Sequence, residues 1–188
     1  ILSLLKPDIM TAAGATQLCA GQKGGIEAVI HAMTDIFSKM ETEAVLLADA
    51  SNAFNSLNRR AALHNIRHIC PPIFTALSNF YGTPTKLFVM GGAELLSQEG
   101  TTQGCPLAMA MYALGILPLI NELRPTMSPS ATPTEMPTQA WYAEDAQAAG
   151  SLLSLRRWWD KMNTLGPAYG YFPNAVKSFL VVKPGLID

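Results

Sequence analysis

The stretch AVLLADA, residues 44–50, decides how the rest of the chain is interpreted. Its first five residues are apolar and lie between Glu43 and Asp49, a pattern typical of a short strand that is covered on both faces. Asp49 follows this strand directly, so its carboxylate is expected where the strand leaves the sheet. A carboxylate in such a place is a candidate for a functional site.

The composition is that of a globular protein. With 188 residues, of which 49% are hydrophobic and 14% charged, the chain can bury one sizeable core. The most apolar run, residues 107–120, is too short to cross a bilayer, so a buried helix and no membrane contact are expected. The net charge of -1 gives no basic excess for binding phosphate backbones. Three widely spaced cysteines fit neither a disulfide framework nor a zinc site, which favours a reducing, intracellular location, nuclear or cytoplasmic.

The spacing of apolar residues and the turn residues predict the elements around this strand. Helices are predicted over residues 26–40, 59–69, 73–81, 107–120 and 152–165. Strands are predicted over residues 86–90, 94–98, 139–142, 147–149 and 179–182, the first two joined by a turn at Gly91-Gly92. Residues 125–137, rich in Pro, Ser and Thr, are expected to form a surface loop. This mixture predicts an α+β fold, an antiparallel sheet with helices packed on one face.

Glu144 and Asp145 lie at the predicted tip of the second hairpin. A tight turn relaxes the alternation of side chains along a strand, so both acids can point to one place and converge with Asp49. Three gathered carboxylates need protons or cations to offset their repulsion, and paired divalent ions serve phosphoryl transfer. Spacing alone leaves an alternative open, in which Asp49 caps a turn and the other two acids are solvated.

Five segments, in this order along the chain, resemble motifs of reverse transcriptases. They are GQKGG (21–25), similar to the glycine-containing finger segment; LLADASNAFNSLNR (46–59), similar to the first palm motif; TTQGCPLAMAMYALG (101–115), similar to the QGxPL motif; WYAEDA (141–146), similar to the YxDD box; and GYFPNAVKSFLVV (170–182), similar to the motif with Asn and Lys that follows that box. The resemblance covers nearly the whole chain and is nearest to the enzymes of non-LTR retrotransposons.

The resemblance implies a polymerase palm-like domain over residues 41–188, preceded by a partial fingers segment over residues 1–40, with the thumb absent. It implies an RNA-directed DNA polymerase, which extends the 3′-hydroxyl of a DNA primer with dNTPs on an RNA template. Two Mg²⁺ or Mn²⁺ ions would be its cofactors. By position, their ligands and the catalytic acids would be Asp49, Glu144 and Asp145.

Four further residues take expected roles from the resemblance. Phe54 falls where the family keeps an aromatic ring against the sugar of the incoming nucleotide, and the alternative for it is a core aromatic. Gln103 and Gly104 match positions that contact the nucleotide and the template. Lys177 resembles the catalytic lysine that meets the phosphates or protonates the pyrophosphate, although by itself it would be a surface lysine.

The YxDD box departs from the family pattern at one acidic position. Glu144 stands where the family has Asp, and its carboxylate is one methylene further from the backbone. A displacement of about 1 Å in an active site reduces the rate roughly 10²-fold. Cys105 and Asn55 also differ from residues common in related elements. Two outcomes therefore stay open: an impaired polymerase, or an inactive reverse-transcriptase-like remnant that acts as a structural or nucleic-acid-binding module.

Overall fold

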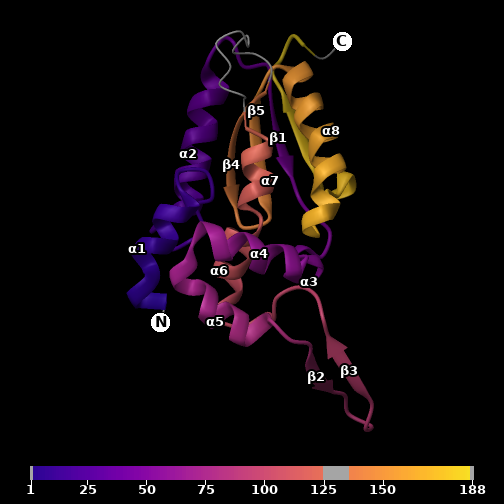
Figure 1. The fold of residues 1–188 in the computed structure, drawn as a ribbon. Helices are drawn as coiled ribbons and strands as arrows, with labels where there is room; N and C mark the ends of the chain where they lie inside the picture. Colours follow the sequence, from indigo (N-terminus) through magenta and orange to yellow (C-terminus); the bar gives the residue numbers. More distant parts are fainter. Residues whose placement is uncertain (1, 125–135, 187–188) are drawn as a thin grey trace.

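The centre of the fold is a four-stranded antiparallel sheet with the strand order β4-β5-β1-β6 (Figure 1). The structure is a computed structural model that describes residues 2–124 and 136–186. The strands are β1 (Ala44–Ala48), β4 (Thr138–Tyr142), β5 (Asp145–Gly150) and β6 (Phe179–Val182). The predicted α+β fold and its antiparallel sheet are confirmed, and β1 has the predicted bounds.

The register of the sheet brings distant acids together. β1 pairs with β5 over its whole length, and the pairing ends with Ala48 opposite Ala146. β4 and β5 form a hairpin whose two-residue turn is residues 143–144. Continuing the β1–β5 register by one residue puts Asp49 opposite Asp145. Residues that lie opposite each other on neighbouring strands are close enough for their side chains to interact.

Helices cover both faces of the sheet. α2 (Gly25–Ser38) packs on one face, and α8 (Leu152–Tyr169) packs on the other (Figure 1). Because side chains alternate along a strand, Val45 of β1 joins a cluster with Met33 of α2, whereas Ala48 joins the main core with α8. The predicted palm region thus supplies the helix on one face, and the predicted fingers segment supplies the helix on the other.

Most of the remaining helices gather beyond the end of the sheet where β1 leads into α3 (Figure 1). The helices at this end are α1 (Leu2–Ala13), α3 (Ala53–Ser56), α4 (Arg59–Ile69), α5 (Pro71–Tyr81) and α6 (Ala108–Gly115). The single helix predicted over residues 107–120 is wrong, because the chain forms α6 and then α7 (Leu117–Glu122). Pro118 in the first turn of α7 has no N–H to donate to the preceding turn, so it begins a new helix.

A second, two-stranded sheet extends away from the rest of the molecule (Figure 1). It consists of β2 (Thr85–Phe88) and β3 (Glu94–Ser97), joined through Gly91 and Gly92 as predicted. The loop predicted over residues 125–137 lies almost wholly outside the described residues. The three cysteines are free thiols, and no described helix is long and apolar enough to cross a membrane.

Candidate active site at the β4–β5 turn

The backbone of Asp49 is held by the segment that precedes β6. The Asp49 N–H donates to Ser178 Oγ at 3.2 Å, and the Asp49 carbonyl accepts from the Asn174 N–H at 2.9 Å. One carboxylate oxygen, Oδ1, is buried and has no hydrogen-bond partner among the described residues. A buried charged oxygen without a donor is unfavourable, so a cation placed there would be stabilising.

The three acids affect one another electrostatically. Burial raises the pKa of Asp145, and the negative charge of Asp49 raises it further. Burial is also the main cause that raises the pKa of Glu144, with the charges of Asp145 and Asp49 adding to it. Glu144 and Asp145 therefore resist ionisation unless positive charge is supplied nearby.

The expected convergence of all three carboxylates on one point is not what the structure shows. Within residues 2–124 and 136–186, no three His, Cys, Asp or Glu side chains are grouped so that they could hold a metal ion. In the register, Asp49 and Asp145 occupy opposed positions, whereas Glu144 lies within the turn itself. The role of the three acids as metal ligands stays a prediction.

The turn that carries the acids is fixed from two sides. Ala143 has a φ of 55°, which is rare for a residue with a Cβ. Its backbone bonds to the side chain of Gln17, and the Glu144 carbonyl accepts from the Tyr171 hydroxyl at 2.9 Å. Burial, and then the charges of the three acids, raise the pKa of Tyr171, which keeps this hydroxyl a donor. Gln17 was missed by sequence reasoning, because its partner lies far along the chain.

Phe54 packs on the core beside the acidic end of the sheet. It lies on α3, and its ring stacks on Tyr112 of α6 with centroids 4.6 Å apart and planes 25° apart. Its carbonyl accepts from the Thr101 N–H at 2.7 Å, which ties α3 to the loop before α6. The stacking favours the core aromatic alternative for this ring, and contact with a nucleotide sugar stays a prediction.

Gln103, Gly104 and Lys177 are exposed. Gly104 has a φ of 86° with open space around the position of a Cβ, so its backbone conformation, and not close packing, favours glycine there. Lys177 ends the short helix η1 (Ala175–Lys177) and precedes Ser178, the acceptor of the Asp49 N–H. In the described part of the chain its amine forms no ion pair with the three acids.

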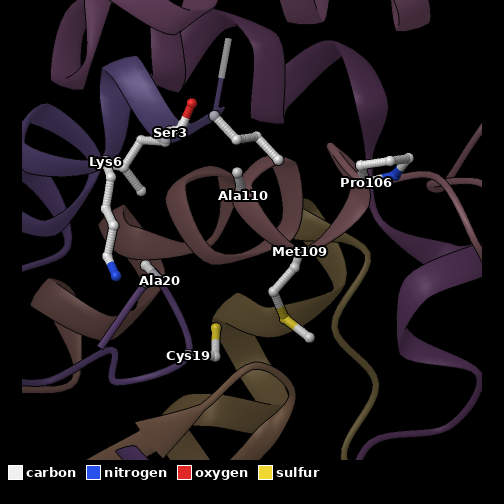
Figure 2. Close-up of a pocket in the computed structure, with 10 residues that line it drawn as sticks. Ser3, Lys6, Cys19, Ala20, Pro106, Met109 and Ala110 are labelled. Carbon is white, nitrogen blue, oxygen red and sulfur yellow. The ribbon is translucent and has the colours of Figure 1, made fainter. Parts of the chain in front are cut away.

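A pocket of about 270 Å³ lies near the acidic turn (Figure 2). Its wall includes Cys19, where burial raises the thiol pKa to about 12 and the nearby charge of Glu144 contributes. Met109 and Pro106 continue the segment that carries Gln103 and Gly104. The labelled residues around it are Ser3, Lys6, Cys19, Ala20, Pro106, Met109 and Ala110. The lining is mostly apolar, with the Lys6 amine as its positive charge.

No known protein family matches the sequence, and no curated protein matches it. Solved structures nevertheless share its fold. Telomerases are among these structures. Apo telomerase from Candida tropicalis matches with a TM-score of 0.65 at 13% identity, over 97% of this chain and 35% of that chain.

Two further telomerase structures give the same result. The Candida tropicalis apo enzyme truncated from its C-terminal domain has a TM-score of 0.70 at 12% identity, over 97% of this chain and 40% of that one. Telomerase from Candida albicans, in complex with the TWJ fragment of telomeric RNA, has a TM-score of 0.66 at 9% identity, over 97% and 35%. The chain thus spans 35% to 40% of the length of these telomerase chains, and the likeness shows the fold alone.

Proposed function

We propose that the chain is the palm, with part of the fingers, of an RNA-directed DNA polymerase of the non-LTR retrotransposon kind. The observation that carries the proposal is the register that sets Asp49 opposite Asp145, at the end of a sheet whose fold resembles telomerase. Residues 41–188 would be the palm-like domain and residues 1–40 the partial fingers, and the reaction would take place in the nucleus or cytoplasm. An RNA template, a DNA primer and dNTPs would be the partners.

The acidic end of the sheet suits divalent cations. Asp49 Oδ1 is buried without a donor among the residues that the structure describes, and the pKa values of Glu144 and Asp145 are raised by burial and by neighbouring negative charge. Asp49 and Asp145, with Glu144 beside them, would therefore hold Mg²⁺ or Mn²⁺ through oxygen ligands. When bound, such ions lower the pKa of an attacking hydroxyl and offset the charge of the leaving group.

The other predicted residues would bind and orient the nucleotide. Gln103 and Gly104, on an exposed loop, are free to meet the nucleotide and the template strand. Phe54 would limit the space at the sugar 2′ position. Lys177 would neutralise the phosphates and give a proton to the departing pyrophosphate.

A second candidate function, a non-catalytic structural or nucleic-acid-binding module, is favoured by one observation. No three potential ligands are grouped for a metal ion within the described residues, and Glu144 lies in the turn where the family pattern has Asp. The two candidates differ in one respect: only the polymerase requires that the acids bind cations.

Primer extension by the complete protein that contains this chain tests the proposal. A primed RNA template, dNTPs and Mg²⁺ or Mn²⁺ should give a DNA product, and Asp49→Asn should abolish it. Glu144→Asp should raise the rate, because it restores the shorter acid. Asp35→Asn, an exposed acid on α2, is the matched control and should change nothing. No product from the natural protein and none after Glu144→Asp would leave the non-catalytic module as the answer.

A further inference from the structure

We infer that Gln17 is a positioning residue, which fixes the direction of the acidic turn from outside the β4–β5 hairpin. Its catalytic consequence rests on the proposed polymerase function, whereas its structural part does not. No motif assigned this residue, and it lies in the predicted fingers segment, far from the turn in sequence.

The segment around Gln17 runs alongside β4. The Trp141 N–H donates to the Thr16 carbonyl at 2.8 Å, and the Leu18 N–H donates to the Trp141 carbonyl at 2.8 Å. Gln17 and Trp141 therefore form a parallel bridge at the outer edge of the sheet. This bridge holds Gln17 beside Trp141, which lies two residues before Ala143, so the Gln17 side chain can reach Ala143.

The Gln17 side chain is fully buried, and both of its polar ends bond to one residue. Nε2 donates to the Ala143 carbonyl at 3.1 Å, and Oε1 accepts from the Ala143 N–H at 2.9 Å. A side-chain amide thus pairs with a turn residue as a neighbouring strand would, and Ala143 is itself buried. Without this pairing, two buried backbone groups would have no partner.

This pairing matters because the conformation of Ala143 is disfavoured. A φ of 55° brings its Cβ close to backbone atoms, so the residue holds that value only while its surroundings impose it. The two hydrogen bonds between the Gln17 side chain and the Ala143 backbone are called the clamp below. If the clamp were lost, Ala143 would relax towards negative φ, and Glu144 and Asp145 would rotate with it. Asp145 would then no longer face Asp49 in the β1–β5 register.

A merely structural glutamine predicts something different. It would satisfy buried polar groups and add to stability, but its loss would leave the rate of a still-folded enzyme unchanged. A positioning residue predicts a loss in kcat with little change in KM, because binding of the nucleotide does not need the turn whereas catalysis does.

The test uses Gln17→Met, which keeps the length of the side chain and removes both hydrogen bonds. Gln22→Met is the matched control: this half-buried glutamine of the same segment donates one hydrogen bond to a different carbonyl, that of Gly14. Gln17→Glu keeps an acceptor for the Ala143 N–H, but sets a carboxylate oxygen against the Ala143 carbonyl, so it should also weaken the pairing. It also serves as the second variant if Gln17→Met does not fold.

The first readout is hydrogen exchange at the Ala143 amide, which needs no activity. We expect slow exchange in the natural protein and in Gln22→Met, and exchange about 10²-fold faster in Gln17→Met. Unchanged exchange in Gln17→Met and Gln17→Glu would overturn the clamp.

The second readout is primer extension by the complete protein. Gln17→Met should lower kcat about 10²-fold, with the KM for dNTP within about threefold. Adding Ala143→Gly should recover at least part of that loss, since glycine takes the positive φ without a clamp. A fast-exchanging variant with unchanged kcat would make Gln17 structural only and overturn the inference.

If the natural protein makes no product, the polymerase proposal fails and Mn²⁺ binding decides the inference. The dissociation constant for Mn²⁺, measured by electron paramagnetic resonance, should be about tenfold higher in Gln17→Met than in Gln22→Met, because misdirected ligands bind less tightly. Equal affinities would contradict the inference, whereas no Mn²⁺ binding by the natural protein would contradict the proposed cation site and leave hydrogen exchange at Ala143 to decide the inference.

Discussion

The two hairpins of this chain achieve the same kind of backbone turn in opposite ways. The β2–β3 hairpin uses Gly91 and Gly92, with φ values of 107° and 90°, and nothing lies within 4 Å of where their Cβ atoms would be. The β4–β5 hairpin uses Ala143 at a φ of 55° and holds the turn by hydrogen bonds between Gln17 and Ala143 and from the Tyr171 hydroxyl to the Glu144 carbonyl. A glycine adopts a positive φ without help from its surroundings, so nothing fixes the orientation of the β2–β3 turn. The β4–β5 turn depends on hydrogen bonds, and these hold the acidic side chains in one orientation.

The two hairpins also differ in where they are fixed. The acidic turn is held at its tip, whereas the β2–β3 hairpin is held at its base by Arg59. The buried Arg59 guanidinium donates to the carbonyls of Ser97, Glu99 and Gly100 and to Ser97 Oγ. The far end of this hairpin is exposed, and a two-stranded hairpin alone is only marginally stable in water.

Removing the anchor at the base should have the largest effect on stability. Arg59→Met should lower the free energy of unfolding by about 3–5 kcal/mol, because three carbonyls and Ser97 Oγ lose the hydrogen bonds of a buried guanidinium. Urea denaturation measures this change. Arg60→Met, the exposed neighbour on the same helix, should stay within about 0.5 kcal/mol of the natural chain. Equal effects at the two positions would show that the base of this hairpin is not fixed by Arg59.

Removing the hydrogen bond between Tyr171 and the acidic turn should have an intermediate effect on stability. Tyr171→Phe removes the hydroxyl that donates to the Glu144 carbonyl and should lower the free energy of unfolding by about 1–2 kcal/mol. The same denaturation experiment applies, with the half-buried Tyr169→Phe as control. A loss no larger than that of the control would show that the turn does not depend on this hydrogen bond.

Exchanging the turn residues should give smaller changes of opposite sign. Ala143→Gly should raise the free energy of unfolding by up to about 1 kcal/mol, because glycine has no Cβ to clash with the backbone in the left-handed conformation. Gly91→Ala should destabilise its hairpin by about 1 kcal/mol. Hydrogen exchange should report that second change only in residues 85–97. Faster exchange throughout the sheet would contradict the independence of the two hairpins.

The dependence of stability on pH should be the smallest effect. Because the folded-state pKa values of Glu144 and Asp145 are raised, the folded state binds protons more tightly than the unfolded state. Stability should therefore fall as pH rises from about 4 through the raised pKa values, by less than about 1 kcal/mol since both groups are partly exposed. Denaturation at several pH values should show a shallower fall in Asp145→Asn. A steeper fall would contradict the assigned sign.

Local signals in the sequence were sufficient for much of the fold. The apolar run of β1, the helical spacing of α2 and the Gly91-Gly92 turn each depend on neighbours along the chain, so pattern alone predicted them. The break between α6 and α7 was missed although Pro118 is visible, because a continuous apolar run outweighed it.

The site could be predicted only in part. Its residue types were visible, but the opposition of Asp49 to Asp145 depends on pairing between strands that are distant in sequence. The same limit hid Gln17, whose only distinctive property is a partner at Ala143. Composition could not show how the turn presents Glu144, and its role as a metal ligand beside the other two acids stays a prediction.

The central claim is that Asp49 and Asp145 together accept a divalent cation. Its most direct test is the thermal midpoint of the chain, measured by circular dichroism as Mn²⁺ is added. An ion that binds only the folded state raises the thermal midpoint. The midpoint should therefore rise with Mn²⁺ concentration in the natural chain and in Asp35→Asn. It should not rise in the double variant that combines Asp49→Asn with Asp145→Asn. The account would be contradicted if the thermal midpoint of the natural chain did not change with Mn²⁺, or if the midpoint of the double variant rose by the same amount.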